Sequence, residues 1–127
     1  MIRHIVAIII TLFTLQSCAQ VEKKQMSNNN NAEYRLFPTE NMWTFLKLNT
    51  RNGKLWQVQY DVKEDNRFVS DLSNTALVNA DKEMNERFTL YSTKNMYTFI
   101  LLDQIDGKTW QVQWSIDAKN RFVIPIE

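Results

Sequence analysis

The 127-residue chain has a single histidine, His4, and a single cysteine, Cys18. The sequence after Cys18 therefore contains neither side chain. This excludes from it Ser-His-Asp and Cys-His catalysis, thiol redox chemistry, and zinc sites built from imidazole or thiolate. Because no disulfide can form there either, we expect a fold held by its hydrophobic core, with no metal and no cofactor.

Excess charge of either sign is also missing. Lys and Arg total 15 and Asp and Glu total 14, so the chain is close to neutral. Proteins that bind nucleic acid need clustered positive charge to neutralise phosphates. We therefore expect no nucleic-acid partner.

The main feature that is present is a 54-residue repeat. NMWTFLKLNTRNGKLWQVQY begins at Asn41, and NMYTFILLDQIDGKTWQVQW begins at Asn95, in register and without a gap. Trp56 thus corresponds to Trp110. A unit copied in this way predicts a folding module, and two copies are expected to pack into one domain.

The N-terminal region indicates export. Residues 5–15 are an apolar run, broken only by threonines, that is too short to span about 30 Å of hydrocarbon, which is typical of a signal peptide. Leu15-Gln16-Ser17-Cys18 resembles the lipobox of bacterial lipoproteins. The resemblance implies a signal peptide over 1–17 and lipidation of Cys18, palmitate included, as the mature N-terminus. Several acyl chains on one residue anchor a protein more firmly than one.

The residues after Cys18 bear on where this anchor lies. Ala19 stands where some lipoproteins carry the Asp that retains them at the inner membrane, so we expect the outer membrane. The acidic cluster that marks surface export in Bacteroides-like bacteria is missing, which favours a periplasm-facing domain over the cell surface. Residues 18–33 include an Asn tract at 28–31 and little apolar content. We predict that they form a flexible tether, because burial cannot offset their ordering entropy.

Residues 34–127 are predicted to form one all-β domain: repeat 1 over 34–71, a linker over 72–86, and repeat 2 over 87–127. Period-two alternation and hairpin signals at Asn52-Gly53 and Asp106-Gly107 predict antiparallel strands, arranged as in propeller blades or a sandwich. The expected strands are 34–36, 42–49, 55–62 and 68–69, then 88–91, 96–103, 109–116 and 121–126. The linker is expected to cross the edge of the first unit, with a short strand at 75–78 and a helical turn near 81–85.

The hairpin register decides which side of each sheet meets the core, and two registers are open. A two-residue turn places Phe45 opposite Tyr60, whereas a three-residue turn with a glycine bulge places Leu48 opposite Trp56. We favour the second because it puts Lys47 opposite a glutamine on the wetter face. Under that register the wetter face also carries Trp43, Phe45, Tyr97, Phe99, Gln57, Gln59, Gln111 and Gln113.

These eight residues are the candidate ligand-binding set. Aromatic rings stack on apolar surfaces while glutamine amides both donate and accept hydrogen bonds, which suits a sugar or a peptide. The alternative is that the glutamines form cross-strand polar ladders on a solvated face.

Acidic residues gather near the turns and are a weaker candidate site. A hydrolase can use paired carboxylates, but the acids Asp61, Glu64 and Asp65 of the first repeat have no acidic counterparts in the second repeat. We therefore expect solvated acids and no catalytic residues. The recurring Asn66-Arg67 and Asn120-Arg121 pairs are expected to place Asn in a left-handed turn and Arg at the start of an edge strand. The acidic groups are Asp61, Glu64 and Asp65, and Asp103, Asp106 and Asp117.

Three recurring motifs carry a family resemblance: T-x-N-M-[WY]-T-F, G-K-x-W-Q-V-Q-[WY] and N-R-F-V. Together with the lipobox they resemble small two-repeat lipoproteins of Bacteroides-like bacteria, which implies a lipid anchor and a β fold but no active site. Asp103, Gly107 and Trp110 are also similar to the Asp-x-x-x-Gly-x-x-Trp hairpin of propeller blades, although Asn49 replaces the acid in repeat 1. Because two blades cannot close a propeller, that similarity implies a dimer or a sandwich.

The leading hypothesis is a membrane-anchored, non-enzymatic lipoprotein whose β domain binds an envelope protein or a glycan. A homodimer is a further expected form of association. The alternative is a structural accessory or immunity-type subunit that docks by β-edge addition. A carboxylate-based hydrolase ranks third. It predicts two acids facing one cleft.

Overall fold

The computed structural model describes residues 31–127. The predicted signal peptide, Cys18 and most of the predicted tether lie outside the described residues. Within them the fold is all-β, as predicted, and it consists of two antiparallel four-stranded sheets. None of the helices in the described part is long and apolar enough to cross a membrane.

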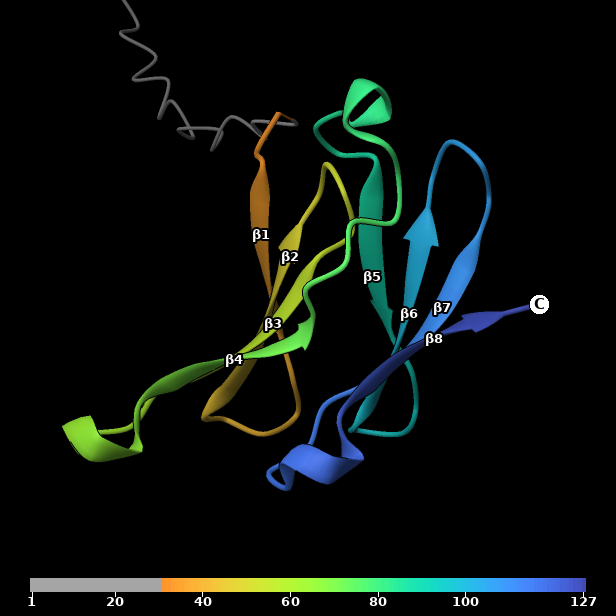
Figure 1. Ribbon diagram of the computed structural model, residues 1–127. Coiled ribbons are helices and arrows are strands. Elements are labelled where there is room, and N and C mark those ends of the chain that lie inside the picture. The colour runs from red at the N-terminus through yellow and green to blue at the C-terminus, as the bar shows by residue number, and fades with distance from the viewer. Residues whose placement is uncertain (1–30) are drawn as a thin grey trace, which may run out of the picture.

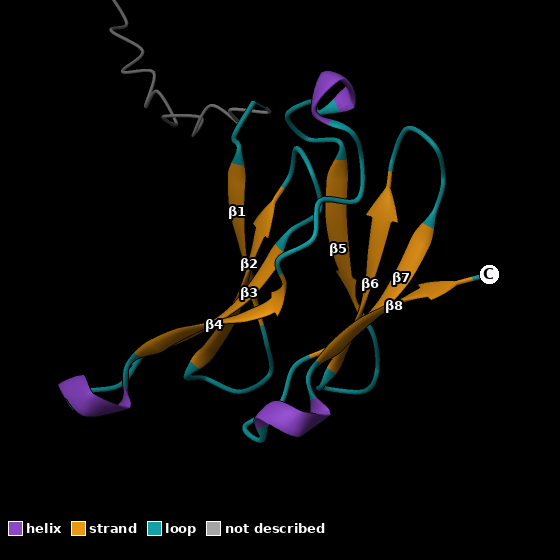
Figure 2. Ribbon diagram, viewed as in Figure 1, coloured by secondary structure: helices purple, strands orange, loops and turns teal. Residues whose placement is uncertain are grey.

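The two repeats build one sheet each, and the two sheets lie side by side (Figure 1). Both are meanders in which every strand pairs with its neighbour in the sequence. Three single-turn 3-10 helices occupy the connections (Figure 2). Sheet 1 contains β1 (Tyr34–Pro38), β2 (Thr44–Asn49), β3 (Leu55–Gln59) and β4 (Phe68–Ser73), and sheet 2 contains β5 (Phe88–Ser92), β6 (Thr98–Asp103), β7 (Thr109–Gln113) and β8 (Phe122–Ile126). The 3-10 helices are η1 (Glu64–Asn66), η2 (Ala80–Lys82) and η3 (Ala118–Asn120).

Both predicted hairpin registers are wrong. The structure places Phe45 opposite Val58 and Lys47 opposite Trp56, and the second repeat follows the same register. The reason is a four-residue loop, because Asn49 still pairs with Lys54 through an N–H···O bond of 2.9 Å. The glycines do adopt the left-handed conformation expected of them, with φ of 81° at Gly53 and 75° at Gly107.

This register gives each sheet two chemically different sides. The Trp side carries the tryptophan of the WQVQ motif, and the Gln side carries its two glutamines. On sheet 1 the Trp side includes Tyr34, Leu36, Phe45, Lys47, Trp56, Tyr60 and, from β4, Val69 and Asp71, and the Gln side includes Phe37, Leu46, Leu48, Gln57, Gln59 and Ser70. On sheet 2 the Trp side comprises Phe88, Leu90, Phe99, Leu101, Trp110 and Trp114, and the Gln side Tyr91, Ile100, Leu102, Gln111, Gln113 and Ile124.

The core forms between unlike sides: the Gln side of sheet 1 packs on the Trp side of sheet 2. Leu46, Leu48 and Leu55 from the first join Phe88, Leu101 and their neighbours from the second in one buried cluster. Strand β2 lies against β5, and β4 against β8. Each fully buried Leu or Phe contributes about 1.5–3 kcal/mol relative to exposure. The Trp side of sheet 1 and the Gln side of sheet 2 face outward.

The linker differs from its prediction. Strand β4 runs to Ser73, and the structure has no strand at 75–78. Instead, the Leu77 N–H donates to Asn52 O (2.8 Å), and the Leu77 side chain covers Gly53 so closely that a Cβ there would lie 2.7 Å from its Cδ1. The linker thus crosses the tip of the β2–β3 hairpin, and its helical turn, η2, begins at Ala80.

The T-x-N-M motif is explained by the turn before β2. Thr39 Oγ1 donates to Thr44 O (2.8 Å), and Asn41 Oδ1 accepts from Trp43 N (2.9 Å). Thr93 and Asn95 make the same two bonds before β6, at 2.8 and 2.9 Å. These side chains replace backbone partners in a tight turn, so the recurrence of this motif has a structural cause.

Candidate binding surface

The eight residues predicted as one binding face lie on different sides of the sheets. In repeat 1, Trp43 and Phe45 are half-buried on the outward Trp side, whereas Gln57 is fully buried on the opposite side. In repeat 2, Phe99 belongs to the core, Tyr97 is exposed at its rim, and Gln111 lies half-buried on the outward Gln side. Gln59 lies on the same side of sheet 1 as Gln57, and Gln113 lies on the same side of sheet 2 as Gln111. The prediction of a single shared face is therefore wrong, because it rested on the wrong register.

Gln57 is the most informative of these residues. Its side chain is 0% exposed. Its Oε1 accepts from Ser115 N of repeat 2 at 3.4 Å, but its Nε2 has no hydrogen-bond partner among the described residues. A buried donor without a partner costs about 1–3 kcal/mol. Gln57 therefore lies at the junction between the sheets, out of reach of a ligand at the surface.

We expect Gln57→Leu to stabilise the protein by about 1 kcal/mol, because it removes this donor from the core and keeps the volume similar. The measurement is the free energy of unfolding from urea denaturation. Gln111→Leu is the matched control, and it should leave that free energy nearly unchanged because Gln111 lies on an outward side. A loss of stability in Gln57→Leu would show that the amide has a partner in solution.

The outward Trp side of sheet 1 carries a cluster of aromatic rings. Tyr60 lies 5.3 Å from Trp43 and 6.1 Å from Phe45, and Tyr34 lies 6.2 Å from Trp56, measured between ring centroids. The Lys47 ammonium lies 4.7 Å above the Trp56 ring, within cation–π range. Together these rings form a broad apolar surface that carries two charged groups, the Lys47 ammonium and, opposite Trp56 on β4, the exposed Asp71 carboxylate.

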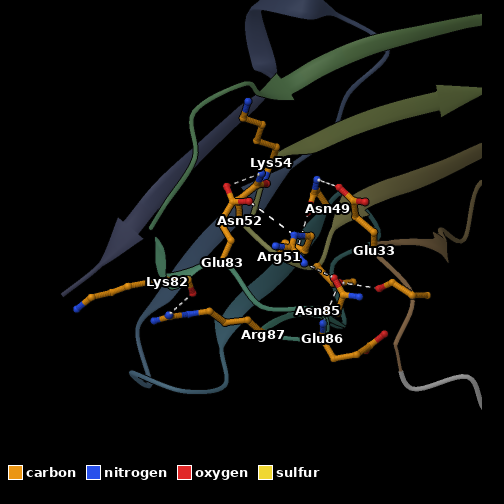
Figure 3. A network of polar contacts seen from close by, with 12 residues as sticks. Glu33, Asn49, Arg51, Asn52, Lys54, Lys82, Glu83, Asn85, Glu86 and Arg87 are labelled. Atoms are coloured by element: carbon orange, nitrogen blue, oxygen red, sulfur yellow. Dashed lines mark hydrogen bonds and ion pairs between the residues drawn. The ribbon is translucent and has the colours of Figure 1, made fainter. Parts of the chain in front are cut away.

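A polar network ties the β2–β3 hairpin to the linker (Figure 3). Arg51 Nη1 donates to Asn85 Oδ1 (2.8 Å) and its Nε lies 3.7 Å from Glu83 Oε2. Asn52 Nδ2 donates to Glu83 Oε1 (3.2 Å). The last residues of the predicted tether also contact this region, since Thr50 Oγ1 donates to Ala32 O (2.8 Å). The network positions the hairpin and leaves the Trp side uncovered.

A buried ion pair holds the corresponding end of sheet 2. Arg87 donates to both carboxylate oxygens of Asp103, at 3.0 and 2.9 Å, and to Asp106 Oδ2 at 2.9 Å. Burial raises the pKa of Asp103, but hydrogen bonds from Arg87 and from the backbone of Ile105 and Asp106 outweigh it, and the pKa lies below its ordinary value. The hydrogen bond to Asp103 raises the pKa of Arg87.

Among the acidic candidates in the described part of the chain, only Asp103 and Asp106 come together, and both are bonded to Arg87, so they form an ion-pair cluster and not two free carboxylates facing a cleft. Asp103 is buried rather than solvated, which corrects the prediction for that residue, and Asp117 instead pairs with Lys119. Asp61 accepts hydrogen bonds within the turn that follows β3, chiefly from Lys63 N and also from the Asn66 side chain. These bonds lower the pKa of Asp61, and they outweigh desolvation, which raises it. Two grooves of the described region each include one acid, Glu40 in one and Glu127 in the other.

Of the prediction for the repeated Asn-Arg pairs, the arginine part agrees with the structure, since Arg67 and Arg121 directly precede the outer strands β4 and β8, and the left-handed asparagine is wrong. Asn66 and Asn120 end 3-10 helices, and neither has a positive φ. Arg67 Nε donates to Asp61 O (2.8 Å) and Arg121 Nε to Ser115 O (2.7 Å). Each arginine thus stabilises the turn before its strand by donating to a backbone carbonyl of that turn.

Comparison with known proteins found no match for this chain among family models, curated proteins or solved structures.

Proposed function

We propose that this chain is a membrane-anchored, non-enzymatic lipoprotein of the outer membrane, facing the periplasm, whose β domain binds an envelope protein through the Trp side of sheet 1. The Cys18 lipobox supports the anchor. The exposed aromatic surface supports the binding role.

One comparison carries this proposal. Leu36 is 60% exposed although its counterpart Leu90 is 5% exposed, and Tyr60 is 45% exposed although its counterpart Trp114 is 0% exposed. The same motif positions that form the core of sheet 2 therefore face solvent in sheet 1. Contiguous exposed apolar surface of this kind marks interaction sites.

A protein partner fits this surface better than a glycan does. Aromatic side chains are enriched in protein interfaces and often dominate their binding energy. A sugar site also needs amides or other polar groups that converge beside the rings, and the WQVQ glutamines of this sheet point to the opposite side.

The test is site-specific photo-crosslinking in intact cells, with the photoreactive residue at position 47 of the full-length chain. We expect protein adducts, and Leu36→Asp should reduce them by at least about tenfold, because a charge placed in an apolar interface costs more than 1.4 kcal/mol. Met84→Asp is the matched control, since Met84 is an exposed apolar residue of the linker. The photoreactive residue at Lys119, in η3, tests for non-specific adducts.

Three results would count against the proposal. Adducts that persist in Leu36→Asp would place the partner elsewhere. Capture at the edge strands but not at position 47 would favour docking by β-edge addition. Retention on envelope polysaccharide without protein adducts would favour a glycan ligand.

A further inference from the structure

Each sheet has a Trp side and a Gln side, yet only one Trp side and one Gln side meet within the chain. We propose that the chain associates head to tail with further copies of itself, the Trp side of sheet 1 in one copy packing on the Gln side of sheet 2 in the next. This rests on the proposed function and names the partner as a second copy.

The interface inside the chain is the template for this contact. The sides that remain open are copies, 54 residues apart in the sequence, of the two sides that already pack together. Their chemistry is retained at most positions. On the Trp side the pairs are Tyr34/Phe88, Leu36/Leu90, Phe45/Phe99, Trp56/Trp110 and Tyr60/Trp114, and on the Gln side Phe37/Tyr91, Leu46/Ile100, Leu48/Leu102, Gln57/Gln111 and Gln59/Gln113.

An arginine contact across the sheets also has an unused copy. The Arg121 guanidinium lies 5.7 Å from the Phe68 ring of the other sheet, and its Nη1 donates to Ser70 Oγ at 3.0 Å. The counterparts of Arg121 and Phe68 are Arg67 and Phe122, whereas the counterpart of Ser70 is Ile124, so the contact with the ring is repeated and the hydrogen bond is not.

Arg67 is already positioned for this role. Its Nε and Nη2 donate to Asp61 O and Val62 O at 2.8 and 3.3 Å, as those of Arg121 do to Ser115 O and Ile116 O at 2.7 and 3.2 Å. In the proposed contact Arg67 of one copy lies over Phe122 of the next.

The two contacting sides are different, so the contact is heterologous. A copy that uses its Trp side still has a free Gln side, and addition continues until the rotation closes a ring or a filament grows. If both copies are tethered to one membrane, their effective concentration rises and a weak contact is sufficient.

Lys47 sets the strength of the contact. Its counterpart in the packed side is Leu101, which is fully buried. Burying an ammonium group without a carboxylate partner is unfavourable. The strands of the Gln side of sheet 2 contribute no acid, and Asp71, which lies on the same side as Lys47, forms no ion pair with it among the described residues. Lys47 therefore makes the association between copies weaker and more reversible than the packing inside the chain. Replacing it with leucine restores the chemistry of the internal interface.

The experiment is sedimentation of the full-length protein in density-matched detergent over a range of concentrations. Tyr60→Asp blocks the Trp side of sheet 1 at a position that does not face Lys47, and Ile124→Asp blocks the Gln side of sheet 2. Both residues are exposed in the single chain, and thermal unfolding checks that both variants fold. If either does not fold, Val69→Asp and Tyr91→Asp, also exposed, block the same two sides.

We expect the wild type to form species larger than a monomer as its concentration rises, and each blocked variant alone to stay monomeric. A mixture of the two blocked variants has one usable pair of sides left, so it should form a one-to-one dimer and nothing larger. Lys47→Leu should lower the concentration needed for association by at least about tenfold.

Two results would overturn the inference. Dimers of Ile124→Asp alone would mean that Trp sides pair with each other. Monomers at every concentration for both the wild type and Lys47→Leu would mean that the chain does not self-associate. In that second case, foreign adducts at position 47 that disappear in Leu36→Asp would leave the proposed function standing with a different partner.

Discussion

Trp114→Ala is expected to lower the free energy of unfolding by about 3–5 kcal/mol, the usual cost of truncating a buried Trp. Trp114 is fully buried on the Trp side of sheet 2, its ring centroid lies 4.9 Å from that of Tyr97, and its Nε1 donates to Met96 O at 2.8 Å. Truncation removes this hydrogen bond and leaves a cavity between the sheets. The measurement is urea denaturation followed by circular dichroism.

Tyr60→Ala is the matched control, because Tyr60 occupies the same place in repeat 1. Its side chain is exposed on the outward side, so its truncation should change the free energy of unfolding by about 0.5 kcal/mol. Equal losses in the two variants would mean that the Trp side of sheet 1 is covered in the folded monomer, which would contradict the fold and remove the basis of the binding proposal.

Asp103→Asn is expected to lower the transition temperature by about 10 °C, because it leaves the buried Arg87 guanidinium without its main counter-charge. Asp103 and Arg87 side chains are 1% and 4% exposed and joined by two hydrogen bonds. Asp117→Asn is the control, since the Asp117–Lys119 pair lies in solvent and such pairs contribute little. A change as small as that of the control would mean that Arg87 needs only Asp106.

The same carboxylate predicts a pH dependence. Its pKa in the folded protein lies below the ordinary value of about 3.9 that applies to the unfolded chain. Its contribution is therefore complete well above that value and is lost as the pH falls through the folded pKa. Transition temperatures of the wild type and of Asp103→Asn should accordingly differ most near pH 7 and converge below pH 4. A constant difference across this range would contradict the assignment.

The elements of this fold could be predicted because their signals are local. Alternation of apolar and polar residues, as in Trp110-Gln111-Val112-Gln113, requires only that a strand be half-buried. Positive φ at Gly53 and Gly107 depends on the turn alone. These signals located all eight strands, although their bounds moved by a few residues and β4 extends into the predicted linker.

The register could not be predicted from the same signals. The loop between β2 and β3 includes two residues more than a tight Asn-Gly turn, and side-chain bonds within it hold that length. Asn49 Oδ1 accepts from Arg51 N (2.9 Å) and Asn52 Oδ1 from Lys54 N (3.2 Å). One sequence signal pointed toward the correct sides: Lys47 replaces Leu101, and a lysine is rarely buried without a partner. That substitution marks the Trp side of sheet 1 as the outward one.

The sequence by itself determined the repeat, the antiparallel strands and the positions of the hairpin turns, because each depends on residues close together in the chain, while the lipid anchor stays a prediction. Only the tertiary structure decided that the same motif buries its tryptophan in one repeat and its glutamine in the other. The two sides of a half-buried strand become different only when a second sheet packs on one of them. With two sheets stacked in the same orientation, one Trp side and one Gln side must remain open, and on this chain those are the surfaces left for a partner.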